Sequence, residues 1–193
     1  MLAGNYLKHF ICTLHFRFQD FGLDWGVDMI EPPDSHLVNA AIGWIGLGCP
    51  DEAETELNQL SPANRTHSVV LDIRWAICAH RKNWNAALEI ARAELAAAPD
   101  EASGWLHHAY ALRRASADGV AQAWDALLPA ADKFPDEEVI PYNLSCYACQ
   151  MNQLDMARRW LDRAVARGTK DKIKKMALAD EDLKPLWAEI KEW

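Results

Sequence analysis

An alanine that recurs every 34 to 36 residues is the feature that most constrains the fold of this chain. In each case an apolar or small residue follows four positions later, so the two side chains share one face of a helix. Pro99 and Pro135 each follow an anchor alanine by twelve residues, where a helix should end. This self-similarity predicts repeated structural units that stack on one another. The anchors are Ala53, Ala87, Ala123 and Ala157, with spacings of 34, 36 and 34 residues.

A second apolar pattern precedes each anchor alanine and completes a pair of helices. The members of each set share one face of a helix, and short turn-like stretches separate them from the anchor helix. We therefore expect an all-α chain with four helix pairs over residues 34–167. The sets are Leu37, Ala41 and Trp44; Leu71, Trp75 and Cys78; Trp105, Ala109 and Leu112; and Leu144, Ser145 and Ala148.

A helix pair repeated about every 34 residues, with a small residue where its helices cross, resembles the tetratricopeptide repeat (TPR). The resemblance covers about residues 34–167. It implies an α-solenoid of about four TPR-type helix pairs with a C-terminal capping segment. The most family-like stretches are Gly104-Trp105-Leu106, with Pro99 before them, and Tyr142-Asn143-Leu144-Ser145-Cys146-Tyr147, followed by Ala157 and Leu161.

Three residues depart from the regular pattern, and each predicts a local change. Trp75 stands where the repeat usually has a small residue, so the second pair should be splayed or repacked. Pro62 comes early, so the second helix of the first repeat should end short. Pro129 lacks a backbone donor and would clash with the carbonyl of Asp125, which predicts a kink or an early helix end.

The two ends of the chain fall outside the repeats. Residues 1–33 are rich in aromatic side chains, and the breaker Glu31-Pro32-Pro33-Asp34 at their end separates them from the repeats. Three interpretations are open: a cover on the first repeat, a mobile recognition arm, or a disordered or non-native extension with Met29 as the natural start. We favour the last. A signal peptide is not expected, because no small-residue cleavage site follows the short apolar run at residues 10–14.

Residues 168–193 are expected to form C-terminal capping helices. The last repeat of a solenoid exposes an apolar face that must be covered. Apolar residues at helical spacing are suited to this role, whereas the lysines between them face solvent. The apolar residues are Ile173, Met176, Leu183, Leu186, Trp187 and Ile190.

Composition and charge narrow the function further. The formal net charge of −8 disfavours nucleic-acid binding. The sequence contains no run of about 18 apolar residues, which is the length needed to span a membrane. The five cysteines are odd in number, so we expect free thiols in a reducing, cytoplasmic compartment.

Only one pair of residues has the spacing of a reactive site, and it falls in an unfavourable place. Cys146 and Cys149 form a Cys-x-x-Cys, but in mid-helix rather than at a helix start. Metal binding would need further ligands, of which His107 could be one. No glycine-rich phosphate loop or nucleophile elbow is present. We expect no enzyme activity, no metal and no cofactor, with a redox or metal protein as the less favoured alternative.

The resemblance implies a protein-interaction scaffold, in which the first helix of each repeat lines a concave groove that holds a peptide or partner helix. The first helix of the third repeat carries a local positive patch of His107, His108, Arg113 and Arg114. Its groove face would present His107, Tyr110 and Arg114, which predicts a protein partner with an acidic or C-terminal segment. Val38 and Ile42 occupy the places at which some family members clamp a terminal carboxylate, so that activity is not expected. A chaperone for a secreted protein is the other alternative. The predicted groove residues are Asn39, Asp72, His80, His107, Tyr110, Arg114, Asn143, Cys146 and Gln150.

Overall fold

The structure is a computed structural model that describes residues 30–193. Within this range the chain is all-helical and contains no β-strand. It divides into two compact units, called here the first unit (residues 30–107 of the described range) and the second unit (residues 108–193). The interpretations of the aromatic N-terminal stretch concern mainly residues 1–29, which lie outside the described residues, as does Cys12.

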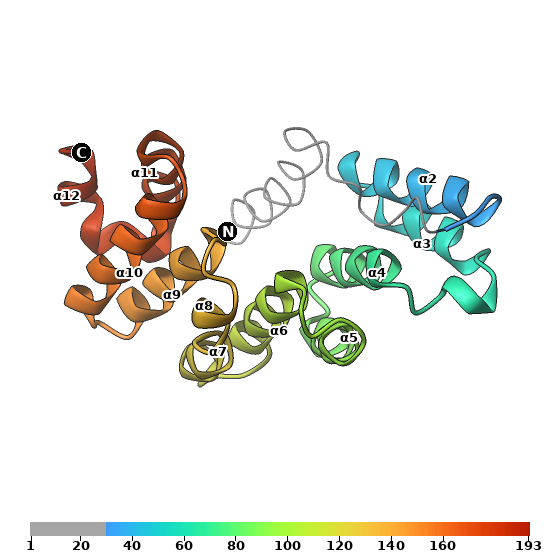
Figure 1. Cartoon of the computed structure of the whole chain (residues 1–193), viewed down its shortest axis with the longest axis horizontal. Helices are drawn as coiled ribbons and strands as arrows, with labels where there is room; N and C mark the ends of the chain where they lie inside the picture. Colours follow the sequence, from blue (N-terminus) through green and yellow to red (C-terminus); the bar gives the residue numbers. More distant parts are fainter. Residues whose placement is uncertain (1–29) are drawn as a thin grey trace. The chain divides into compact units, whose positions relative to one another are not determined.

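The first unit contains the first two helix pairs (Figure 1). Helix α2 packs against α3, and α4 packs against α5. The anchors Ala53 and Ala87 are fully buried, as expected where two helices cross closely. Ile30, just before the Pro32-Pro33 breaker, is also buried in this core. The elements are α2 (Asp34–Gly46), α3 (Pro50–Asn58), η2 (Pro62–Asn64), α4 (Ser68–His80), α5 (Trp84–Ala97) and the first part of α6 (Ala102–Ala115).

The second unit holds the rest of the third repeat, the fourth repeat and the C-terminal cover, a name used here for residues 168–193. Helix α9 packs along α10, and the anchors Ala123 and Ala157 are fully buried. The cover buries Leu183, Leu186 and Ile190. The elements are α7 (Gly119–Leu127), α8 (Ala130–Lys133), α9 (Val139–Gln150), α10 (Leu154–Arg167), α11 (Lys170–Leu178), η3 (Glu181–Leu186) and α12 (Trp187–Lys191).

Two helices end early near prolines, as the sequence predicts. Helix α3 has 9 residues, against 14 in α5 and in α10, and Pro62 follows soon after its end. Helix α7 ends at Leu127, and the separate short helix α8 begins at Ala130, immediately after Pro129. The predicted break at Pro129 is confirmed. Its cause is the missing backbone donor of proline.

The bulky Trp75 is accommodated by repacking. Its side chain is fully buried, and its ring stacks on that of His107 with 4.0 Å between centroids and an angle of 8° between planes. The tryptophan therefore reaches the first helix of the following repeat instead of facing a small neighbour. None of the helices in residues 30–193 is both long and apolar enough to cross a bilayer.

Candidate functional site

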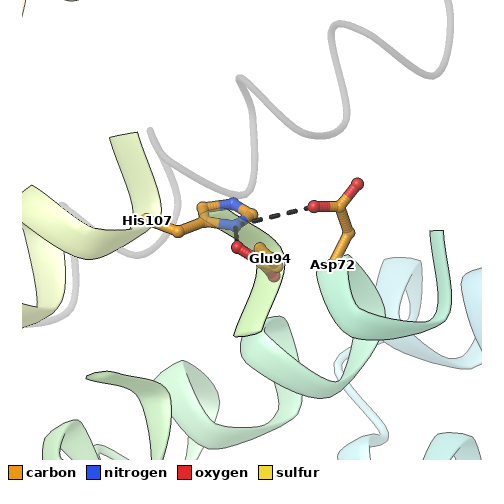
Figure 2. A group of neighbouring side chains, drawn as sticks. All are labelled: Asp72, Glu94 and His107. Atoms are coloured by element: carbon orange, nitrogen blue, oxygen red, sulfur yellow. Dashed lines mark hydrogen bonds and ion pairs between the residues drawn. The ribbon is translucent and has the colours of Figure 1, made fainter. Parts of the chain in front are cut away.

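Two of the predicted groove residues meet in the first unit, together with a third residue that sequence reasoning missed. His107 Nδ1 lies 2.8 Å from Glu94 Oε2 and 3.6 Å from Asp72 Oδ1. Figure 2 shows one edge of the imidazole facing both carboxylates, which come from α5 and α4. All three side chains are less than a tenth exposed. We call this group the buried polar cluster.

The cluster is held by packing as well as by polar contacts. The flat face of the His107 ring lies on the Trp75 indole, which fixes the plane of the imidazole. With the ring so placed, Nδ1 points at the Glu94 carboxylate, an acceptor-only group when ionised. Glu94 follows Ala87 and Ala91 on the buried stripe of α5. A charged residue on an apolar stripe was the sequence signal that could have found it.

The distances within the cluster favour a hydrogen bond over a metal centre. Asp72, Glu94 and His107 offer ligand atoms within 4.8 Å of one another. However, the Nδ1–Oε2 separation of 2.8 Å is that of an N–H···O hydrogen bond. Two ligands of a tetrahedral zinc ion, each about 2.0–2.1 Å from the metal, would lie about 3.3 Å apart. The residues are therefore arranged to bind one another.

The remaining predicted residues of the first unit lie outside this cluster. Asn39 is exposed on α2. His80 is half-buried at the end of α4, and burial lowers the pKa of its imidazole below the ordinary value. For both residues, contact with a partner in the groove stays a prediction.

In the second unit, Tyr110 and Arg114 form a compact pair on α6. The Arg114 guanidinium lies over the Tyr110 ring, 3.4 Å from its centroid, and also donates a hydrogen bond of 3.2 Å to the Tyr110 carbonyl oxygen. Burial raises the pKa of the Tyr110 hydroxyl and lowers that of the Arg114 guanidinium. Stacking on the ring leaves Arg114 half-buried rather than fully exposed to solvent.

One face of α9 is occupied by the C-terminal cover. Tyr142, Cys146 and Gln150 recur at intervals of four and so share a helical face. Asp180 Oδ2 accepts a hydrogen bond from the Tyr142 hydroxyl at 3.1 Å and one from Cys146 Sγ at 3.5 Å. The Gln150 amide donates to the Asp182 carbonyl oxygen at 3.2 Å. Two predicted groove residues, Cys146 and Gln150, thus contact the chain itself.

Arg113 completes this arrangement, although sequence reasoning had not placed it in the groove. Its guanidinium forms an ion pair with the Asp182 carboxylate. Burial acts to lower the pKa of Arg113, but the hydrogen bond and charge of Asp182 outweigh it and raise the pKa above its ordinary value. Asn143, the last predicted residue, donates its amide to the Val139 carbonyl oxygen of its own helix at 2.9 Å. Cys146, Asp180 and Asp182 also have the residue types of a metal site, but Arg113 already supplies the cation.

The Cys-x-x-Cys lacks the features of a redox site. Cys146 and Cys149 are buried within α9. Burial raises the pKa of both thiols, and the nearby Asp180 carboxylate raises that of Cys146 further. Since the thiolate is the reactive species, this environment favours the protonated, less reactive form of both thiols.

Comparison with known proteins bears on the fold. No family model matches the chain, and no curated protein matches it. Among solved structures, the chain is similar to the crystal structure of TTC0263, a thermophilic TPR protein from Thermus thermophilus, with a TM-score of 0.66 at 19% sequence identity. The match covers 81% of this chain and 82% of that one. The predicted fold is confirmed: the chain is an all-α helical-repeat protein with the TPR solenoid architecture.

Proposed function

We propose that this chain is a protein-interaction module that binds a polypeptide partner and catalyses no reaction. The TPR architecture supports the proposal, because stacked helix pairs present a series of parallel helices on which an extended peptide or a helix can lie. The observation that carries it is the pair of arginines on α6, of which Arg113 binds a carboxylate and Arg114 lies on an aromatic ring.

The chemistry of this part of α6 selects an acidic partner segment. The chain has a net charge of −8, so two adjacent arginines stand out against an acidic background. A guanidinium recognises a carboxylate through a planar fork of donors, and the Tyr110 ring offers an amphipathic surface beside it. Asn143 of α9 adds an amide for hydrogen bonding to a peptide backbone. The proposed ligand is an acidic stretch or a C-terminal segment of another protein.

The predicted groove residues of the first unit divide into two roles. Asn39 and His80 remain candidates for direct contact with a partner, since neither belongs to the buried polar cluster. His107 of α6 contacts both Asp72 of α4 and Glu94 of α5, and we assign Asp72 and His107 to positioning those helices. The proposal therefore concentrates specificity in the second unit and gives the first unit a supporting role.

The test is affinity capture of partners from native extract, followed by binding measurements on Arg114→Glu. A charge-assisted hydrogen bond contributes about 1.5–3 kcal/mol, so the reversal should weaken the partner by at least ~10-fold. Arg159→Glu, a charge reversal at an exposed position of α10, is the matched control and should leave affinity within about 2-fold. Equal affinity of the Arg114 variant and wild type would place the partner on another surface.

A further inference from the structure

The C-terminal cover does more than bury apolar surface. Leu183, Leu186 and Ile190 are buried, and η3 packs against both helices of the fourth repeat, α9 and α10. Asp180 and Asp182 lie beside them and are 9% and 6% exposed, although an aspartate in a covering segment could as readily face water. Two carboxylates are therefore buried away from water, and the polar contacts that they make offset the loss of hydration.

Those contacts come from four residues, which we call the acid-binding stripe: Tyr142, Cys146 and Gln150 of α9 with Arg113 of α6. Each member donates, the first two to Asp180 Oδ2, Gln150 to the Asp182 carbonyl oxygen, and Arg113 to the Asp182 carboxylate. A side-chain carboxylate, a backbone carbonyl and a second carboxylate are all engaged. This is the set of contacts by which a protein binds an acidic peptide.

The acidic segment, residues 180–182, has a fixed local conformation of its own. Asp180 Oδ1 accepts a hydrogen bond of 2.9 Å from the Asp182 backbone N–H, which caps η3 and fixes the spacing of the two carboxylates. Both aspartates are held in one local turn, so the Asp180-Glu181-Asp182 sequence has its own geometry. A segment of another protein with the same Asp-x-Asp turn would present the same acceptors.

We propose that the acid-binding stripe is a receptor for an Asp-x-Asp turn, that Asp180-Glu181-Asp182 is its tethered occupant, and that a partner protein binds by replacing this segment with an acidic turn of its own. The inference rests on the proposed function and names both the partner's recognition element and the step that must precede binding. Other contacts hold the cover when the aspartates leave. Arg158 donates two hydrogen bonds, of 2.8 and 2.7 Å, to the Glu189 carboxylate, and Lys172 pairs with Glu138.

The test uses the full chain and a synthetic fluorescein-labelled peptide with the sequence of residues 178–187. A tethered segment acts at an effective concentration of about a millimolar, so the peptide should bind wild type weakly. In the Asp180→Asn/Asp182→Asn variant the internal competitor is weakened, and the peptide should bind at least ~10-fold more tightly. Adding Arg113→Gln to that variant should abolish the gain. A peptide with both aspartates changed to asparagine should bind none of the three.

A second measurement on the wild-type chain does not depend on the stability of any variant. Hydrogen exchange followed by mass spectrometry should show faster exchange in the chain's own residues 180–187 when the unlabelled peptide is added in excess, with α9 still protected. Unchanged exchange, together with no tighter binding by the double variant, would overturn the proposal. Loss of helical signal in the double variant without peptide-induced exchange in wild type would also overturn it, because the aspartates would then be obligatory parts of the fold. Neither result bears on the Arg114→Glu test, since that uses a foreign partner.

Discussion

The bond between Glu94 and His107 allows a quantitative test of how the repeats of the first unit are joined. The informative substitution is His107→Phe. Phenylalanine keeps a flat ring for the stack on Trp75, 4.0 Å away, but removes the nitrogen that lies 2.8 Å from the Glu94 carboxylate. The buried carboxylate then loses that partner. Leaving a buried polar group without its hydrogen-bond partner typically costs about 1–3 kcal/mol, so we expect a loss of about that size in the free energy of unfolding.

The double variant Glu94→Leu/His107→Phe separates the bond from the packing. Replacing both partners of a buried polar pair with apolar groups of similar shape is much less costly than removing one. We expect the double variant to be more stable than His107→Phe alone, with a coupling energy of about 1.5–3 kcal/mol between the two sites. Asp72, 3.6 Å from His107 Nδ1, limits the recovery, because it too faces the new apolar ring.

The assay is urea unfolding followed by circular dichroism and tryptophan fluorescence, with coincident transitions as the check on two-state behaviour. Glu89→Gln is the matched control on the same helix, because the Glu89–Arg92 pair is exposed and should contribute less than about 0.5 kcal/mol. If the two single substitutions add to within about 0.5 kcal/mol in the double variant, Glu94 and His107 are not coupled and our account of the cluster is wrong.

Three further predictions follow from local geometry. A Cβ at Gly119 would overlap the carbonyl oxygens of Leu112 and Arg113, so Gly119→Ala should lower the melting temperature. A Cβ at Gly43, in mid-helix, would meet nothing within 4 Å, so Gly43→Ala should raise the free energy of unfolding by about 0.5–1 kcal/mol. Hydrogen bonds from Ser61 and Asn64 lower the pKa of Asp34, so the stabilising effect of this carboxylate is complete above the unfolded-state pKa of about 3.9 and disappears as pH falls through the native-state pKa. In urea titrations, the difference in stability between wild type and Asp34→Asn should therefore shrink below about pH 4. A difference that stays constant with pH would contradict this. Deleting residues 170–193 should expose the apolar side of the fourth repeat around Leu161 and cause aggregation or loss of that repeat, and a monomer with unchanged melting would show that the cover is dispensable.

The features that sequence reasoning could find are those that repeat. Each anchor alanine is fully buried because two helices can cross closely only at a small side chain, and the same need recurs in every repeat. Pro129 and Pro62 act through the backbone alone, so their effects are independent of what surrounds them. Both repetition and the backbone effects of proline can be recognised directly in the amino-acid sequence.

The contacts that sequence reasoning missed depend on which side chains meet across different helices. Glu94 and His107 are 13 residues apart, on separate helices, and no periodicity links them. Arg113 and Asp182 are joined only because the C-terminal cover turns back onto α9 after α11. The chain carries a positive patch on α6 and the acidic residues Asp180-Glu181-Asp182 in the cover, but opposite charges alone do not specify a contact. The spatial path of the cover decides it.

Occupation of the acid-binding stripe by the chain itself changes how affinity at this surface must be understood. The acid-binding stripe needs a carboxylate, because the mostly buried guanidinium of Arg113 would destabilise the second unit if it had no counter-ion. The cover therefore stabilises the fold through the same donors that a partner would use, and the measured affinity becomes the difference between two occupants. If the tethered segment is in place about 99% of the time, a partner that binds only the vacated stripe has its apparent affinity reduced about 100-fold. A partner overcomes this by offering carboxylates in a better-ordered turn or by making additional contacts, for example with Arg114 on its Tyr110 ring. Selectivity would then follow from competition: acidic segments that merely match the cover are excluded, and only those that exceed it bind.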